Sequence, residues 1–104
     1  MDKTYCFDID GIIMTLTPNN NYSKAEPIQK TIEIINLLYQ QGNHIIIFTS
    51  RGYITGIDWS EITKKQLNIF HVMYHELIFG KPAADYYIDD KLISIQEIAN
   101  QLNL

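Results

Sequence analysis

The sequence is poor in cysteine, in glycine and proline, and in long hydrophobic runs: its 104 residues include 1 Cys, 5 Gly and 3 Pro. The single cysteine, Cys6, excludes a framework of internal disulfides, so we expect a reducing, cytoplasmic location and a buried place for this small side chain. The longest apolar run, residues 45–48, is far shorter than the roughly 20 residues that cross a bilayer. We therefore expect no membrane partner.

Positive charge is scarce as well. The chain has 8 Lys and Arg against 12 Asp and Glu, which gives a net charge of −4. Tight binding to a long nucleic acid depends on clustered positive charge, so this balance argues against a nucleic-acid partner. It leaves open a small anionic substrate held by a metal ion. The length and a hydrophobic content of 46% predict one globular domain over residues 1–104.

Apolar runs alternate with segments of helical periodicity along the chain. Such alternation predicts parallel β-α units, and hence an α/β fold with a mainly parallel sheet covered on both faces. The continuous hydrophobicity of the first run also indicates a strand buried on both faces. The expected elements are, in chain order, a strand at 4–9, a loop at 15–25, a helix at 27–41, a strand at 44–48, a helix at 60–70, a short strand at 72–74, a strand at 86–88 and a helix from residue 94.

Polar residues follow three of the expected strands, at the point where each strand ends. Asp8 and Asp10 follow the first, residues 49–51 the second, and Asp89 and Asp90 the last. Ligands bind at this edge of an open α/β sheet, so we expect these side chains to meet there. Four carboxylates in one place repel one another unless a divalent cation lies among them, and oxygen-only ligands favour Mg²⁺.

These motifs resemble, in order, those of the haloacid dehalogenase-like (HAD) phosphatase superfamily. The match consists of residues 8–11 (Asp-Ile-Asp-Gly), Thr49, Lys81 within Gly-Lys-Pro, and the pair 89–90, and it spans residues 5–90. The resemblance implies a HAD-like Rossmannoid fold, a three-layer α/β/α sandwich. It also implies a Mg²⁺-dependent phosphoric monoester hydrolase.

The resemblance assigns a role to each motif residue. Asp8 would attack phosphorus and form an aspartyl-phosphate, and Asp10 would protonate the leaving oxygen and then activate water. Thr49 and the Ser50 amide would hold phosphate oxygens, and Lys81 would neutralise charge in the transition state. Mg²⁺ would be held by Asp8, the Asp10 carbonyl and the motif-four pair, with Asp90 favoured over Asp89 as the direct ligand.

Two positions leave questions open. Arg51 is either a substrate contact or the partner of a surface carboxylate. Ile12 stands where the family commonly has Thr or Val, so a phosphate-facing hydroxyl is absent there, and we expect slower turnover at most.

The spacing of the motifs bears on substrate access. HAD enzymes that enclose small substrates insert a cap domain, and residues 11–26 and 52–80, where it would lie, are too short to fold as one. We therefore expect an open site, suited to a large substrate or covered by a second copy in a homo-oligomer.

A narrower resemblance, to small capless HAD proteins described as capsule or surface-polysaccharide biosynthesis phosphatases, implies a sugar-phosphate substrate. It rests on residues 56–59, Thr63, residues 66–67, residues 74–77 and residues 80–91. The alternatives are a nucleotide or polynucleotide 3′-phosphatase and an inactive HAD-like partner subunit. A signalling receiver domain is disfavoured by the order of its acidic residues. A receiver domain has an adjacent acidic pair after its first strand and its phosphoacceptor aspartate after the third, whereas in this chain Asp-x-Asp comes first and the Asp-Asp pair last.

Overall fold

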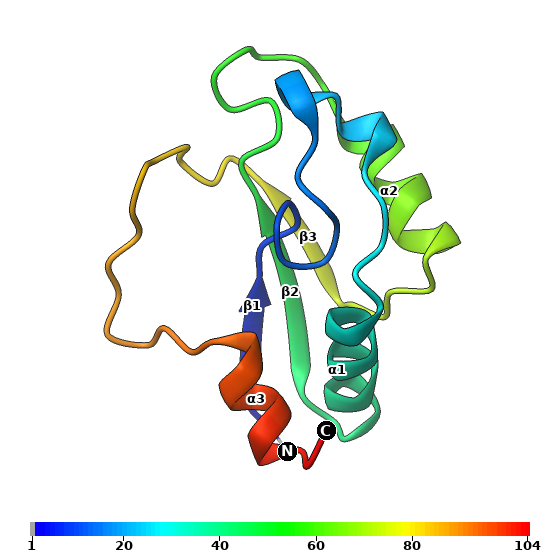
Figure 1. Ribbon diagram of the computed structural model, residues 1–104, viewed down its shortest axis with the longest axis vertical. Coiled ribbons are helices and arrows are strands. Elements are labelled where there is room, and N and C mark those ends of the chain that lie inside the picture. The colour runs from blue at the N-terminus through cyan, green and yellow to red at the C-terminus, as the bar shows by residue number, and fades with distance from the viewer. Residues whose placement is uncertain (1) are drawn as a thin grey trace.

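The structure is a computed structural model that describes residues 2–104. Its centre is a parallel sheet of three strands in the order β1-β2-β3, with helices alongside (Figure 1). The predicted α/β class and parallel pairing are thereby confirmed. The elements in chain order are β1 (Thr4–Phe7), two short 3-10 turns (Pro18–Asn20 and Tyr22–Lys24), α1 (Gln29–Gln40), β2 (His44–Thr49), α2 (Ser60–Ile69), β3 (Glu76–Phe79) and α3 (Ile95–Gln101).

The two faces of the sheet are covered unequally. On one face, Phe7 of β1 lies beside Ile47 of β2, and both are buried against the helices. On the other face Cys6 is exposed, and Ile78 of β3 keeps 41% of its surface exposed. The expectation that the first strand is buried on both faces, and Cys6 with it, is therefore wrong. Side chains alternate between the faces of a strand, and only one face of β1 meets the core.

β1 is also shorter than expected. It ends at Phe7 because the carbonyl of Ile9 accepts the N–H groups of Ile12, Ile13 and Met14, at 2.8 to 3.1 Å, which turns the chain away from the sheet. Gly11 supplies the positive φ, +88°, that this turn requires. The turn is what sets Asp8 and Asp10 just beyond the strand.

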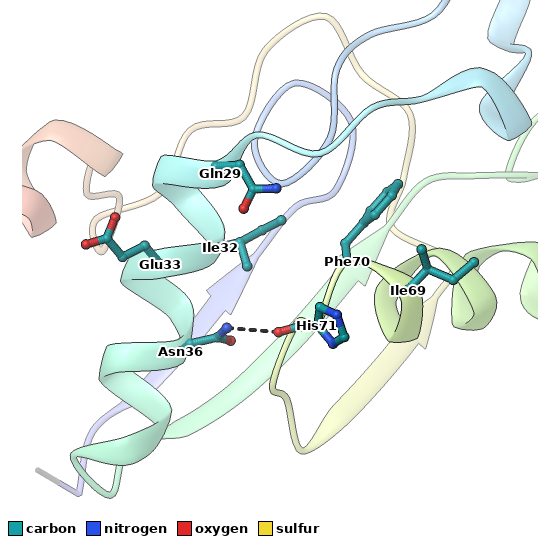
Figure 2. A pocket seen from close by; sticks show the side chains of 7 residues that line it. All are labelled: Gln29, Ile32, Glu33, Asn36, Ile69, Phe70 and His71. Atoms are coloured by element: carbon teal, nitrogen blue, oxygen red, sulfur yellow. Dashed lines mark hydrogen bonds between the residues drawn. The ribbon is translucent and has the colours of Figure 1, made fainter.

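The connection between α2 and β3 differs from the expected strand at 72–74. The N–H of Val72 bonds back to Leu67 of α2, and Asn36 of α1 accepts the Met73 N–H at 2.9 Å and donates to the His71 carbonyl at 2.8 Å. Figure 2 shows the second of these bonds. These hydrogen bonds occupy backbone groups of residues 71–73 that would otherwise pair with β2, so the third strand forms later, at Glu76–Phe79.

Residues 80–94 contain the largest departure from expectation. The predicted buried strand at 86–88 does not form: Tyr86 is 86% exposed and Ile88 98% exposed. Figure 1 shows this yellow-to-orange segment running out beyond the sheet before α3. The Tyr87 hydroxyl donates to the Pro82 carbonyl at 2.6 Å and accepts from the Ala84 N–H at 3.2 Å, so the segment bonds to itself and not to β1.

The last helix forms as predicted. Ser94 accepts the Glu97 N–H at 3.1 Å while the Glu97 side chain accepts the Ser94 N–H at 3.3 Å, which is a capping box. Within residues 2–104, no helix combines the length and apolar character needed to cross a membrane.

Candidate active site

The chain leaves all three strands at the same edge of the sheet, because the strands are parallel. Asp8 follows β1, Thr49 ends β2, and Lys81 lies two residues after the end of β3. The Lys81 N–H donates to the Thr49 carbonyl at 3.1 Å, which ties the last two exits together. The edge predicted from sequence therefore gathers residues from three separate segments.

Asp8 and Lys81 form an ion pair across this edge. The ammonium Nζ lies 3.0 Å from Asp8 Oδ2, although 73 positions separate the two residues. Asp8 Oδ1 accepts the Ile9 N–H at 2.8 Å, which fixes the carboxylate. Both side chains keep some exposure, 29% for Asp8 and 17% for Lys81. A small ligand in solvent can therefore reach this pair.

Asp10 is held by Arg51. Nε of the guanidinium donates to Asp10 Oδ2 at 3.0 Å and Nη2 donates to Asp10 Oδ1 at 2.9 Å, a bidentate pair. The Arg51 side chain has no solvent exposure, whereas that of Asp10 keeps 19%. Of the two roles left open by the sequence, the structure shows neither a surface ion pair nor a side chain free to meet substrate.

Residues to which the sequence assigned no role complete the Arg51 environment. Arg51 Nη1 donates to Thr63 Oγ1 at 3.0 Å and to Gln66 Oε1 at 2.7 Å. The Tyr22 ring lies 4.8 Å from the guanidinium carbon, and its carbonyl accepts from Gln66 at 2.7 Å. The sequence does contain a signal for this cluster. Thr63 and Gln66 are polar residues that lie with Leu67 on the buried face of α2, where apolar residues are expected.

Electrostatics tie Tyr22 to the same cluster. Burial raises the pKa of the Tyr22 hydroxyl, the Asp10 carboxylate raises it further, and the Arg51 guanidinium lowers it. Each of the two acidic side chains at the edge has its own basic partner, Lys81 for Asp8 and Arg51 for Asp10. The charges of Asp8 and Asp10 are thus each balanced by one basic side chain.

Thr49 and Ser50 lie where the sequence placed them, at the end of β2. Thr49 is fully buried, and its Oγ1 accepts the Arg51 N–H at 3.1 Å. Ser50 is half-buried, and its carbonyl accepts the Tyr53 N–H at 2.9 Å. Ile12, which stands where the family has a smaller residue, packs against the core.

Asp89 and Asp90 are not brought to this edge. Both are exposed in the segment 80–94, where Asp89 accepts the Lys91 N–H at 3.0 Å, and this bond lowers the Asp89 pKa. In the part of the chain that the structure describes, no group of three or more Asp, Glu, His or Cys side chains is placed to hold a metal ion. The pair stays away because the strand expected to deliver it, at 86–88, does not form.

A hollow of about 230 Å³ adjoins the charged edge. Gly80 lines it, directly before Lys81, and so do the aromatic side chains of Tyr53, Trp59 and Phe79. A second hollow, of about 330 Å³, lies between α1 and the end of α2 (Figure 2). Neither hollow is lined by Asp8, Asp10 or Lys81. The first is lined by Arg51 and Gly80, which adjoin the charged edge, and the second by no residue of the motifs, so we take the first as the hollow nearer the candidate chemistry.

No family model matches the chain, and no curated protein sequence matches it. Solved structures do match. A crystal structure from Vibrio cholerae has a TM-score of 0.84 and 28% identity, covering 93% of this chain and 87% of the other. The Pnkp1/Rnl/Hen1 complex matches with a TM-score of 0.62 and 20% identity, covering 86% of this chain and 31% of the other.

A third match is the crystal structure of D,D-heptose 1.7-bisphosphate phosphatase from B. bronchiseptica complexed with magnesium and phosphate, with a TM-score of 0.60 and 13% identity. It covers 98% of this chain and 64% of the other. At these identities, the second and third likenesses establish a shared fold.

Proposed function

Because this chain has the haloacid dehalogenase-like fold, we propose that it is a phosphatase that hydrolyses phosphomonoesters through an aspartyl-phosphate on Asp8. The observation that carries the proposal is the contact between Asp8 Oδ2 and Lys81 Nζ, 3.0 Å, at the sheet edge that also holds Asp10. A carboxylate nucleophile beside a cation that can receive a phosphate, with a second carboxylate two residues away, is a set suited to phosphoryl transfer.

In the first step, Asp8 Oδ2 forms a bond to phosphorus while the bond from phosphorus to the leaving oxygen breaks. Oδ1 stays on the Ile9 N–H, so the carboxylate does not rotate during attack. The Lys81 ammonium, released from Asp8 as that oxygen is esterified, neutralises charge on the phosphoryl oxygens.

Asp10 supplies the proton chemistry in this proposal. Asp10 enters the first step protonated and gives this proton to the leaving oxygen; in the second step it takes a proton from the attacking water, which releases phosphate, restores Asp8 and returns Asp10 to its protonated form. The Asp10 side chain keeps 19% exposure, so it is not closed off from solvent by Arg51. Both half-reactions then depend on the direction in which this one carboxylate points.

Mg²⁺ fits part of this site. The hydrogen bonds of the described residues leave the Asp10 main-chain oxygen free, and the Asp8 carboxylate is partly exposed, so two oxygen ligands are in place. A third would come from Asp90, with Asp89 beside it, if the segment 80–94 came in toward the edge. When bound, the ion would offset the charge of the phosphoryl group. Loss of phosphate release on chelation, restored by added Mg²⁺, supports this; activity unaffected by chelator contradicts it.

For the substrate, we propose a sugar phosphate of capsule or surface-polysaccharide synthesis, hydrolysed in the cytoplasm. The hollow beside Lys81 supports this, because its aromatic walls suit the apolar face of a sugar ring and its volume of about 230 Å³ is small beside the roughly 300–1,000 Å³ of pockets for drug-sized ligands. The net charge of −4 disfavours a polynucleotide. Exposed apolar side chains at Tyr86 and Ile88 are consistent with a homo-oligomer that covers the open site.

The test measures phosphate release from sugar phosphates, nucleotides and 3′-phosphorylated oligonucleotides, with Mg²⁺ or chelator. Asp8→Asn is compared with Asp2→Asn, the same chemical change before the opposite end of β1. We expect release from the sugar phosphates by the wild type and Asp2→Asn only. Activity retained in Asp8→Asn refutes the nucleophile; activity confined to oligonucleotides refutes the substrate class. No release on any substrate from folded wild type indicates an inactive partner subunit.

A further inference from the structure

We propose that Arg51 is a positioning residue for the proposed reaction: it fixes the direction of the Asp10 carboxylate, and α2 fixes Arg51 in turn through Thr63 and Gln66. This rests on the proposed function of Asp10 as the group that transfers protons. Nothing in the motif pattern distinguishes this role from direct contact with substrate.

The hydrogen bonds of Arg51 show where its side chain is committed. A guanidinium has five N–H donors. Nε donates to Asp10, Nη1 donates to Thr63 and Gln66, and Nη2 donates to Asp10 and lies 3.4 Å from the Met14 sulfur. Every donor therefore has a protein acceptor, and a substrate could bind the guanidinium only by displacing one of them.

Burial makes the arrangement rigid. The Arg51 side chain has no exposure, and Thr63 and Gln66 are 0% and 8% exposed. A charge that is fully removed from water is retained only where its partners are well placed, and a planar fork that meets a carboxylate through two bonds restricts rotation of that carboxylate. Arg51 thereby restricts the Asp10 carboxyl group to one plane.

The contacts on the far side of the guanidinium come from a different element. Thr63 and Gln66 belong to α2. The Tyr22 carbonyl, which accepts a hydrogen bond from the Gln66 side-chain amide, belongs to the segment before α1. These groups do not reach Asp10 by any hydrogen bond between described residues. Their effect on proton transfer must pass through Arg51, which makes them a separate means of testing the proposal.

The experiment compares two phosphate esters in the same proteins. The leaving group of p-nitrophenyl phosphate is p-nitrophenolate, a stable anion that needs little protonation. The leaving group of glycerol phosphate is an alkoxide, which must be protonated as it departs. Misdirecting Asp10 should slow the second far more than the first. For Arg51→Met we expect kcat/KM, which reports the formation of the aspartyl-phosphate and not its hydrolysis, to fall on the order of 100-fold with glycerol phosphate and several-fold with p-nitrophenyl phosphate. Arg51→Lys keeps a positive charge but cannot bond both Asp10 oxygens in a bidentate way, so its activity with glycerol phosphate should lie between that of Arg51→Met and that of the wild type.

Two outcomes overturn the proposal. A rise in KM with kcat unchanged means that Arg51 binds substrate. An equal loss of kcat/KM on both esters means that Arg51 only supports the fold, since the protonation of the leaving oxygen is then unaffected. A double-mutant cycle with Asp10→Asn gives a further criterion. In the Asp10→Asn background, Arg51→Met should cause little additional loss of activity with glycerol phosphate. Full additivity of the two losses refutes the coupling between Arg51 and Asp10.

Thr63→Val and Gln66→Met keep the ion pair and serve if Arg51→Met does not fold. They should lower the ratio of kcat/KM for glycerol phosphate to kcat/KM for p-nitrophenyl phosphate, while Lys64→Met, at an exposed neighbouring position on α2, leaves this ratio unchanged. An unchanged ratio in both buried variants contradicts the support by α2. If Asp8→Asn retains full activity, the proposed function fails first, and that result is separate from the Arg51 readouts.

Discussion

Replacing Gly52 by alanine should damage the loop that follows Arg51, and Gly56 in the same loop provides a matched control. Both glycines have a positive φ, +78° and +74°. A side chain in that region costs about 1–2 kcal/mol, so both substitutions carry this strain. They differ in the space around the added methyl group: at Gly56 nothing lies within 4 Å, whereas at Gly52 the carbonyl oxygen of Ile57 would be 2.2 Å from Cβ.

The contact at Gly52 can be relieved only by moving the backbone. Ordinary contact begins at 3.4 Å, so the Ile57 carbonyl must move by about 1.2 Å. This carbonyl is main chain and cannot rotate away, and overpacking of this kind costs about 1–3 kcal/mol. The sum predicts about 1–2 kcal/mol of destabilisation for Gly56→Ala and about 2–5 kcal/mol for Gly52→Ala.

Thermal unfolding measures the difference. At about 4 °C per kcal/mol for a domain of this size, Tm should fall by roughly 4–8 °C in Gly56→Ala and roughly 8–20 °C in Gly52→Ala. Urea unfolding with an unchanged slope would show that the folded state itself is destabilised. Equal shifts in the two variants would refute the reasoning, because they would mean that the close approach of Gly52 to Ile57 is absent from the folded loop.

Three further predictions separate core, cap and site. Ile47→Ala should lower the free energy of unfolding by about 2–5 kcal/mol in urea, because Ile47 is fully buried, whereas Ile54→Ala, at an 82% exposed position, should change it by less than about 0.5 kcal/mol. Hydrogen bonds from the Ser60 side chain and then from the Ser60 N–H lower the Asp58 pKa below its ordinary value of 3.8. The Asp58 carboxylate therefore stabilises the fold above that pH, and the stabilisation disappears as the pH falls below it. The Tm gap between wild type and Asp58→Ala should therefore close on acidification, and a gap that persists at pH 2 would contradict this. Lys81→Met should lower kcat for phosphate release by about 10²–10³ while changing stability by less than about 1 kcal/mol, since the Lys81 side chain retains 17% exposure; a loss of stability that matches the loss of activity would assign it a structural role.

Much of the fold could be predicted from local patterns. The helix after Pro27 and the strand at 44–48 were expected close to their observed bounds, because apolar residues recur at helical spacing in one and run continuously in the other. The Ser94 cap of α3 was also readable, since its partner Glu97 lies three residues on. These features depend on residues near one another in sequence.

The expected strands at 72–74 and 86–88 failed for the opposite reason. Each is an apolar run of three residues, too short to specify its own pairing. The side chain of Asn36, in the distant helix α1, accepts the Met73 N–H, and the Tyr87 hydroxyl donates to the Pro82 carbonyl. Partners outside the run decided both cases, and no periodicity within the run could have shown them.

For the site, the order of the strands was sufficient to place Asp8, Asp10 and Thr49 at one edge, because parallel strands all end on the same side of their sheet. Lys81 followed no expected strand, and it joins them because β3 forms at Glu76–Phe79. The tertiary structure alone decided how they are paired. It set Lys81 on Asp8, buried Arg51 against Asp10, recruited Thr63 and Gln66 from α2, and left Asp89 and Asp90 in solvent. Sequence order determines the edge at which a side chain leaves a sheet, whereas the hydrogen-bond partner of a charged group depends on which segments pack together and how far each is removed from water.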